Sequence, residues 1–313
     1  MEKVCSMGRY TLVAIGNPVF DIIETPYIKT TGRVLSGCSV NAALTVGKLG
    51  GKALIIGSIG EDYKYKAESK LRKYGIDAIF LESVETGGFH LIYLDEKMND
   101  RILKIIGLAA DIKLNNELRE LISQGDSILL GPILGEISVD MALSISNLSD
   151  GLIIVDPQGF VRKIEENIVK RVNNPRILEI IRISDVFKPN EHEAETIFGE
   201  RSPVWIARKI VSLGARIGIV TLAERGSVVA TSEGVYRIPA FKTVARDPTG
   251  CGDVYGGAFA FYYLKHEDPI EAAVFASATA SFMVETTGPD FNIDKSELNE
   301  RFDILIDMVE KIG

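Results

Sequence analysis

Short apolar runs alternate with longer amphipathic stretches over most of the chain. Several runs are rich in β-branched residues and have the length of buried strands; they cover residues 11–16, 53–57, 127–130, 152–156, 185–187 and 217–221. Stretches with helical periodicity lie between them, at residues 41–49, 64–74, 136–147 and 203–213. Strands that alternate with helices form parallel sheets. The pattern therefore predicts an α/β fold with a doubly wound, mostly parallel sheet flanked by helices.

Two regions, residues 22–35 and 87–108, break this alternation. In the second, two apolar runs flank the polar residues 95–100, which is typical of a β-hairpin. An isolated hairpin is only marginally stable in water, so we expect the segment after Asp21 to supply further strands. We predict that 22–35 and 87–108 form a small β-sheet lid, and that 1–21, 36–86 and 109–313 form the main α/β domain.

The last part of the chain changes character again. Long helical patterns cover residues 252–264, 269–285 and 294–312. We expect three consecutive helices there.

Charge and cysteine content narrow the classes of function. The 313 residues include 35 Lys and Arg against 43 Asp and Glu, a net charge of −8, without a long basic run. This balance argues against a nucleic-acid partner or a membrane surface. We find no apolar run of about 18 residues and no signal-peptide pattern, and Cys5, Cys38 and Cys251 form no C-x-x-C pair. We expect a cytoplasmic protein in which Cys5 and Cys38 are small apolar fillers.

The segment Asp247-Pro-Thr-Gly-Cys-Gly-Asp253 is the densest cluster of unusual residues. Gly250, Cys251 and Gly252 carry no bulky side chain and precede a helical pattern, where open backbone amides favour an anion. Asp253 follows in the first turn, placed to accept a proton beside this cradle. The alternative is that the glycines end a strand and that Asp253 caps a helix. The local sequence leaves both interpretations open.

Other well-known motifs are absent. Gly47-Lys48 and Gly51-Lys52 are not followed by Ser or Thr, as a P-loop requires. The third glycine after Gly250 and Gly252 is Gly256, one position too late for a dinucleotide fingerprint. The sequence therefore argues against P-loop enzymes and dinucleotide-dependent dehydrogenases.

With its neighbours, the Asp247–Asp253 segment resembles the C-terminal signature Asp-Thr-x-Gly-Ala-Gly-Asp of the ribokinase-like (PfkB) carbohydrate kinase family, with Cys251 in place of alanine. Ser36-Gly-Cys-Ser-Val-Asn-Ala-Ala43 is similar to the family's Gly-Gly-x-x-x-Asn-x-Ala segment, with Ser36 in place of the first glycine. Residues 16–21 and 57–62 also follow in the family's order. The resemblance covers nearly the whole chain and implies a ribokinase-like fold.

The resemblance also implies a reaction. Asp253 would be the general base, and the amides of Gly250, Cys251 and Gly252 would stabilise charge on the transferring phosphoryl group. Asp21, Gly37 and Asn41 would hold the acceptor. Residues 152–162 resemble a segment of the inositol-kinase-like branch, which makes Gln158 and Arg162 candidate acceptor contacts; the alternative is a strand end followed by a surface arginine.

The donor side is implied by further segments. Lys188-Pro-Asn-Glu-His-Glu193 resembles the family's Asn-x-x-Glu motif, in which Asn190 and Glu193 organise Mg²⁺ through water, although a helix cap is the alternative. Residues 220–226 resemble the nucleotide loop, with Ala223 in place of a glycine. The nucleotide contacts implied are Lys188, Asn190, Thr221, Gly226 and Ser277, and small-residue helix packing is the alternative for Ser277. The Asp247 loop and Thr286-Thr-Gly288 resemble a monovalent-cation site that would take an ion such as K⁺.

We therefore predict transfer of the γ-phosphoryl group of ATP to a hydroxyl of a sugar or polyol, either myo-inositol-like or another carbohydrate. A nucleoside kinase is the first alternative, and a non-catalytic sugar-sensing protein of the same fold is the second. The lid would cover the acceptor and exclude water, with hinges at Gly87, Gly88 and Gly107. We expect its outer face to pair with a second subunit in a homodimer.

Overall fold

A ten-stranded sheet forms the centre of the computed structural model, which describes residues 10–313. Its strands are β1 (Leu12–Ile15), β4 (Ala53–Gly60), β5 (Asp77–Ser83), β8 (Ser127–Leu130), β9 (Leu152–Val155), β12 (Val186–Phe187), β13 (Ile217–Thr221), β14 (Ser227–Thr231), β15 (Gly234–Ile238) and β16 (Glu310–Lys311). Their order is β16-β15-β14-β13-β12-β9-β8-β1-β4-β5. The strands from β13 to β5 are parallel, whereas β14, β15 and β16 form an antiparallel edge. The predicted mostly parallel α/β sheet is confirmed.

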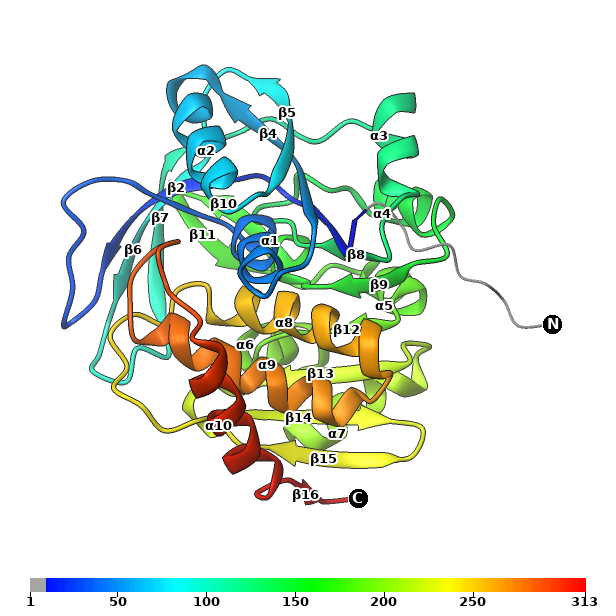
Figure 1. The fold of residues 1–313 in the computed structure, drawn as a ribbon. Helices are drawn as coiled ribbons and strands as arrows, with labels where there is room; N and C mark the ends of the chain where they lie inside the picture. Colours follow the sequence, from blue (N-terminus) through cyan, green and yellow to red (C-terminus); the bar gives the residue numbers. More distant parts are fainter. Residues whose placement is uncertain (1–9) are drawn as a thin grey trace.

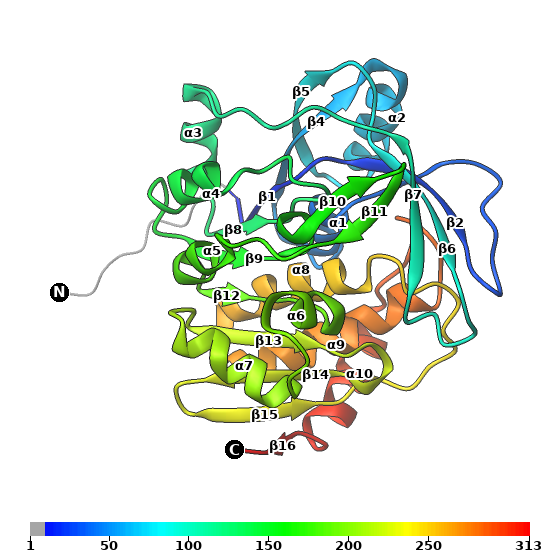
Figure 2. The same ribbon diagram turned by 180° about the vertical axis from the view of Figure 1, so that it is seen from behind.

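Helices cover both faces of this sheet (Figures 1 and 2). They are α1 (Cys38–Lys48), α2 (Glu61–Lys73), α8 (Cys251–His266), α9 (Pro269–Val284) and α10 (Lys295–Ile306) on one face, and α3 (Asn116–Ile122), α4 (Val139–Ser146), α5 (Ile177–Ile183), α6 (Glu191–Phe198) and α7 (Pro203–Ser212) on the other. Short 3-10 turns occur at Gln158–Val161 and Ala223–Arg225. Successive side chains of β1 alternate between the two cores, since Leu12 and Ala14 join one hydrophobic cluster and Val13 and Ile15 join the other.

Two predicted helices are shorter than expected. The last one ends at Ile306 rather than residue 312, because Glu310 and Lys311 pair with the open edge of β15 and satisfy its backbone groups. The helix predicted from residue 136 begins at Val139. Ser138 caps it, and the Glu136 carboxylate accepts backbone N–H groups of the preceding turn.

A separate six-stranded sheet lies against one end of the main body (Figure 1). Its order is β10-β11-β7-β6-β2-β3, with β2 (Val19–Glu24), β3 (Val34–Ser36), β6 (Gly88–Tyr93), β7 (Arg101–Gly107), β10 (Arg162–Glu165) and β11 (Ile168–Arg171). The predicted hairpin is confirmed as the antiparallel pair of β6 and β7, and residues 22–35 contribute to β2 and β3. We refer to these six strands as the lid sheet.

The lid sheet also contains a hairpin that the sequence analysis assigned to the main domain. β10 and β11 are joined by Glu166 and Asn167, which have φ values of 48° and 65°. Two consecutive left-handed residues form the tight turn whose twist matches a hairpin, but neither is glycine, so the usual sequence signal is missing. Ile168 of β11 then pairs with Lys104 of β7 and extends the lid sheet.

The strand order places a topological switch point between β1 and β8. The chain proceeds from β1 to β4 and β5 in one direction, and from β8 through β9 and β12 to β13 in the other. In open α/β sheets, ligands bind outside the carboxyl ends of the strands at such a point. A ligand site is therefore expected at the residues that follow β1, β9 and β12. None of the helices within residues 10–313 has the length and apolar character needed to cross a bilayer.

Candidate active site

The start of α8 is shaped by a glycine. Gly250 is left-handed, with φ 84°, and a Cβ atom there would lie 2.5 Å from Nδ2 of Asn41. The amide of Cys251 donates to the carbonyl oxygen of Pro248 at 3.2 Å and closes the turn into the helix. Asp253 lies in the first helical turn, as the sequence predicted. A larger residue at position 250 would collide with Asn41 and displace this helix end.

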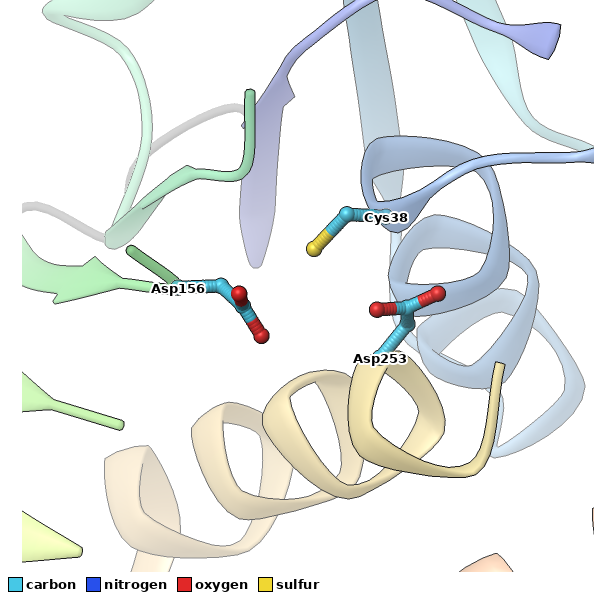
Figure 3. Close-up of side chains that lie close together, drawn as sticks. All are labelled: Cys38, Asp156 and Asp253. Carbon is cyan, nitrogen blue, oxygen red and sulfur yellow. The ribbon is translucent and has the colours of Figure 1, made fainter. Parts of the chain in front are cut away.

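Asp253 is surrounded by groups from three distant segments. Nδ2 of Asn41 donates to Oδ2 of Asp253 at 2.9 Å. Cys38, Asp156 and Asp253 converge (Figure 3), and one ligand atom of each lies within 4.8 Å of the others. Burial raises the pKa of Asp253, and the charge of Asp156 raises it further. The carboxyl group therefore has the environment of a base that binds a proton more readily than an exposed aspartate does.

Asp156 and Lys188 form a buried ion pair that the sequence analysis did not anticipate. Nζ of Lys188 lies 2.7 Å from Oδ2 of Asp156, and the two side chains are 3% and 8% exposed. Burial alone would lower the pKa of Lys188, but the charge of Asp156 and its neighbours raises it above its ordinary value. Both residues directly follow strands, at the carboxyl ends of β9 and β12. Strand ends rich in polar residues were the available signal, but the pairing needed the parallel register of β9 and β12.

The predicted acceptor residues Asp21, Gly37 and Asn41 lie around the start of α1. The carboxylate of Asp21 accepts the backbone N–H of Phe89 at 2.9 Å, and its burial raises its pKa to about 7. Gly37 caps α1 with φ 114°, and the amide of Asn41 donates to its carbonyl oxygen. Asp21 is thereby attached to the lid sheet and Asn41 to the main body.

Gln158 and Arg162 lie farther along the chain from Asp156. The amide of Gln158 donates to Oδ1 of Asp156 at 3.2 Å. Nη1 of Arg162 donates to the carbonyl oxygen of Ile133 at 3.0 Å, and burial lowers the pKa of Arg162. Arg162 is the first residue of β10, so it belongs to the lid sheet and is only partly exposed.

Asn190 and Glu193 form a capping box at the start of α6. The side chain of Asn190 accepts the amide of Glu193, and Oε2 of Glu193 accepts the amide of Asn190, both at 2.9 Å. The helix cap is thus present, and the second carboxylate oxygen of Glu193 takes no part in it. Burial, aided by the charge of Asp156, raises the pKa of Glu193 to about 7.

The segment that resembles a nucleotide loop follows β13. Thr221 forms a parallel bridge with Asn190, which joins this loop to α6. Ala223 adopts φ 52° although it is not glycine, and Gly226 has φ 82° with no room for a Cβ atom, which would lie 2.0 Å from the carbonyl oxygen of Ile238. The hydroxyl of Ser277 donates to the carbonyl oxygen of Pro239 at 2.6 Å. Ser277 thus holds the loop that follows β15.

Asp247 and Thr287 carry orphaned polar atoms. Within residues 10–313, Oδ2 of Asp247 and Oγ1 of Thr287 are buried side-chain oxygens without a hydrogen-bond partner. Oδ1 of Asp247 accepts the amide of Thr249 at 2.9 Å. Burial raises the pKa of Asp247, and Thr287 is among the neighbours that lower it. Two unsatisfied oxygens close to each other suit a cation.

The lid sheet contacts the loop that precedes α8 through residues that the sequence analysis missed. Oη of Tyr93 lies 2.9 Å from Oγ1 of Thr249, and Nη1 of Arg101 donates to the same Oη at 2.8 Å. His192 of α6 contacts the tip of the β6–β7 hairpin, where its Nε2 lies 3.2 Å from the carbonyl oxygen of Asn99. Alternation along 101–106 was the available signal for Arg101, since it puts that residue on the same face as Leu103 and Ile105.

The described cysteines are free thiols. Cys38 is buried and Cys251 partly buried, and burial raises the pKa of both. Cys38 faces Asp253 and so lies beside the site, which its interpretation as a filler did not foresee. Cys5 lies outside the described residues.

Known proteins are similar to this chain in both sequence and fold. A family model described as pfkB family carbohydrate kinase matches residues 1–296. A ribokinase from Lactococcus lactis is 28% identical and aligns over 96% of this chain and 98% of its own. A nucleoside kinase from Methanothermobacter thermautotrophicus is 26% identical over 93% and 95%.

Solved structures of other proteins are similar to this chain in fold. A pyrophosphate-dependent kinase in the ribokinase family has a TM-score of 0.79 at 24% identity and covers 92% of this chain and 99% of its own. A ribokinase from Thermotoga maritima has a TM-score of 0.74 at 24% identity, with 94% and 99% covered. Both share the fold of this chain. With the family match spanning almost all of its length, the chain is an enzyme of the pfkB family of carbohydrate kinases.

Proposed function

We propose that this kinase transfers the γ-phosphoryl group of ATP to a hydroxyl of a polyol or sugar, with Asp253 as the general base. The observation that carries this is the buried Asp253 carboxylate, which accepts a hydrogen bond from Asn41 and stands beside the glycine-lined start of α8. Burial raises the pKa of Asp253, which suits a base that takes a proton from the acceptor hydroxyl.

In the proposed step, the acceptor oxygen forms a bond to the γ-phosphorus while the bond from phosphorus to the β–γ bridging oxygen breaks. The hydroxyl proton passes to Asp253, and ADP leaves with the bridging oxygen. The amides of Gly250, Cys251 and Gly252 stabilise the negative charge on the transferring group. Loss of one such donor raises the barrier by about 3 kcal/mol in comparable sites.

We assign the acceptor to Asp21, Gly37, Asn41, Gln158 and Arg162. Carboxylate and amide groups that donate and accept hydrogen bonds match a ligand rich in hydroxyl groups. A myo-inositol-like polyol is our first choice, and a structural neighbour was solved with a pyrophosphate analogue and myo-inositol. A nucleoside is the second choice, because relatives at similar identity are nucleoside kinases.

We assign the donor to Lys188, Asn190, Thr221, Gly226 and Ser277, which lie along one side of the sheet's carboxyl edge. The Glu193 oxygen that is not used by the helix cap, together with Asn190, fits Mg²⁺ held through water. A bound magnesium ion would neutralise phosphate charge. Because the Ser277 hydroxyl is engaged by Pro239, we assign Ser277 to van der Waals contact with the adenine.

A monovalent cation such as K⁺ fits beside Asp247 and Thr287. The orphaned carboxylate oxygen and hydroxyl offer oxygen ligands, and the loop leads directly into Gly250. A bound cation there would hold the start of α8 in place.

The lid sheet completes the proposal. We infer that residues 22–35 and 87–108 cover the acceptor and keep water out, as a cytoplasmic kinase in abundant ATP requires. The outer face of the lid sheet carries partly exposed isoleucines at 22, 92, 102, 106 and 168, and we infer that it pairs with a second copy. Ile102→Glu should convert a dimer into a monomer in light scattering, whereas Ile304→Glu on α10 should not; a monomeric wild type would refute the pairing.

The decisive experiment is a matrix of phosphoryl donors and acceptors. ATP and pyrophosphate are each tested with polyols, pentoses, hexoses and nucleosides, using the wild type and Asp253→Asn. We expect transfer from ATP to a polyol or sugar, and a kcat at least about 10²-fold lower for Asp253→Asn. Calorimetry should show that this variant still binds ATP. Transfer only from pyrophosphate, or near wild-type turnover by Asp253→Asn, would contradict the proposal.

A further inference from the structure

Two arginines of the lid sheet face the main body. On β7, Arg101 shares a face with the buried Leu103 and Ile105, while Lys104 is exposed on the opposite face. Arg162, the first residue of β10, shares a face with Val169 through the β10–β11 register. Within residues 10–313, neither guanidinium group lies within ion-pair distance of a carboxylate.

Arg101 is held at the edge of the proposed phosphate cradle. Its Nη1 donates to Oη of Tyr93 at 2.8 Å, and its guanidinium carbon lies 5.5 Å from the centre of the Tyr93 ring. The same Tyr93 hydroxyl bonds to Thr249 at 2.9 Å, and Thr249 directly precedes Gly250. Asp253 and Glu193 are both among the charges that act on Arg101. The charge of the Arg101 guanidinium group therefore acts on both the base Asp253 and the donor motif at Glu193.

This position leaves most of the donors of Arg101 unused. A guanidinium group has five N–H donors, and in the described part of the chain Arg101 makes one side-chain hydrogen bond. A charged group withdrawn from water without a counter-ion is costly, so such a group is expected to meet an anionic ligand. The negative charge that forms at this place during the proposed reaction is that of the transferring phosphoryl group.

We propose that Arg101 is a catalytic residue that binds the oxygens of the transferring phosphoryl group from the lid side, opposite the amides of Gly250 and Gly252. The proposal rests on the function proposed above and leaves its bond changes as written there: the phosphorus–oxygen bond to the acceptor forms, the bond to the leaving ADP breaks, and the proton goes to Asp253. Arg101 contributes charge and hydrogen bonds only.

This role links lid position to chemistry. Because Arg101 is carried by β7, the cradle is complete only when the lid sheet lies against Thr249. When the lid sheet is away from Thr249, the site lacks the charge of Arg101, so ATP hydrolysis is suppressed. A lid sheet that only covered the site would exclude water without contacting the phosphoryl group.

The test compares Arg101→Ala and Arg101→Lys with Lys104→Ala, which removes a cation from the outer face of the same strand. We expect Arg101→Ala to lower kcat at least about 10²-fold with little change in the KM of the acceptor. Added guanidinium ion should restore part of the activity of Arg101→Ala only. In calorimetry, Arg101→Ala should bind ADP as the wild type does, but bind ADP with aluminium fluoride and magnesium more weakly.

Each possible result either supports or overturns the proposed role of Arg101. A kcat that falls no further than in Lys104→Ala, or a raised acceptor KM at unchanged kcat, would overturn the proposal, the second by showing that Arg101 binds the acceptor. If the wild type transfers phosphate to no acceptor, the proposed function fails, and the calorimetric comparison still decides whether Arg101 binds a phosphoryl-like anion. If Arg101→Ala does not fold, Arg101→Lys, which keeps the charge but loses the planar fork, is measured against the same expectations.

Discussion

Nδ2 of Asn41 donates to Oδ2 of Asp253 at 2.9 Å, although 212 positions separate the two residues in the chain. The contact joins the first turn of α1 to the first turn of α8, which pack against each other. It supplies a donor to a buried carboxylate and lowers the pKa that burial has raised. Asn41 therefore sets how readily Asp253 takes a proton as well as where it points.

Asn41→Asp should shift the acid limb of the pH–rate profile to higher pH. Two carboxylates at hydrogen-bond distance raise the pKa of one of them, so a larger share of Asp253 would be protonated at neutral pH. Activity below the new pKa should fall about tenfold for each unit of the shift. Asn147→Asp, at the end of α4, is the control. An unchanged acid limb would mean that Asp253 does not titrate in the reaction.

Lys188→Met should destabilise the fold strongly. It leaves the Asp156 carboxylate buried without its partner, which costs about 3–5 kcal/mol in comparable buried pairs. Urea unfolding measures the loss, and a Lys188→Met/Asp156→Asn double variant should regain part of it. Arg237→Met, which breaks an exposed pair with Glu310, should cost less than about 1 kcal/mol. Equal losses in the two single variants would refute a special role for the buried pair.

Glu193→Gln should raise the magnesium concentration needed for half-maximal activity by about tenfold or more. Glutamine also completes a capping box, so the helix start is retained while the charge is lost. A magnesium titration at saturating ATP gives the midpoint, with Glu195→Gln on the exposed side of α6 as the control. If the midpoint does not move, Glu193 serves the helix cap alone.

Asp21→Asn should flatten the pH dependence of stability. The pKa of Asp21 is about 7 in the fold against an ordinary value of 3.8, so the folded state favours its protonated form. Its stabilising contribution is complete below about pH 4 and is lost as the pH rises through 7. Asn does not titrate, so ligand-free Asp21→Asn should gain on the wild type between pH 4 and pH 8 in urea unfolding. Asp303→Asn, an exposed control, should follow the wild type; parallel curves for Asp21→Asn would contradict the raised pKa.

Asp247→Asn should abolish activation by K⁺. The amide replaces the orphaned anionic oxygen with a group that binds a cation less well. The wild type is expected to turn over faster in potassium chloride than in choline chloride at equal ionic strength, and Asp247→Asn should not distinguish the two salts. Equal rates for the wild type in both salts would remove the cation from the proposal.

The overall architecture could be predicted from the sequence because its strongest signals are local. Buried parallel strands such as 152–155 are continuous apolar runs, and the hairpin of β6 and β7 shows two largely apolar segments around a polar turn. The start of α8 is equally local, since glycines and Asp253 lie within a few residues. The sequence analysis did not predict the edge strands β5, β14 and β15. It also missed the β10–β11 hairpin, whose turn lacks glycine, and β16, which pairs with β15.

Which charged groups share the site depends on long-range packing that no local pattern indicates. The sequence marked Lys188 for the nucleotide, but its pairing with Asp156 depends on β9 and β12 lying side by side. In the sequence, Arg101 is one of several basic residues in a hairpin, and packing of the lid sheet on the main body brings it beside Tyr93 and Thr249. Burial and distance set the charge state and the partner of each group, and both arise when segments far apart in the chain pack together.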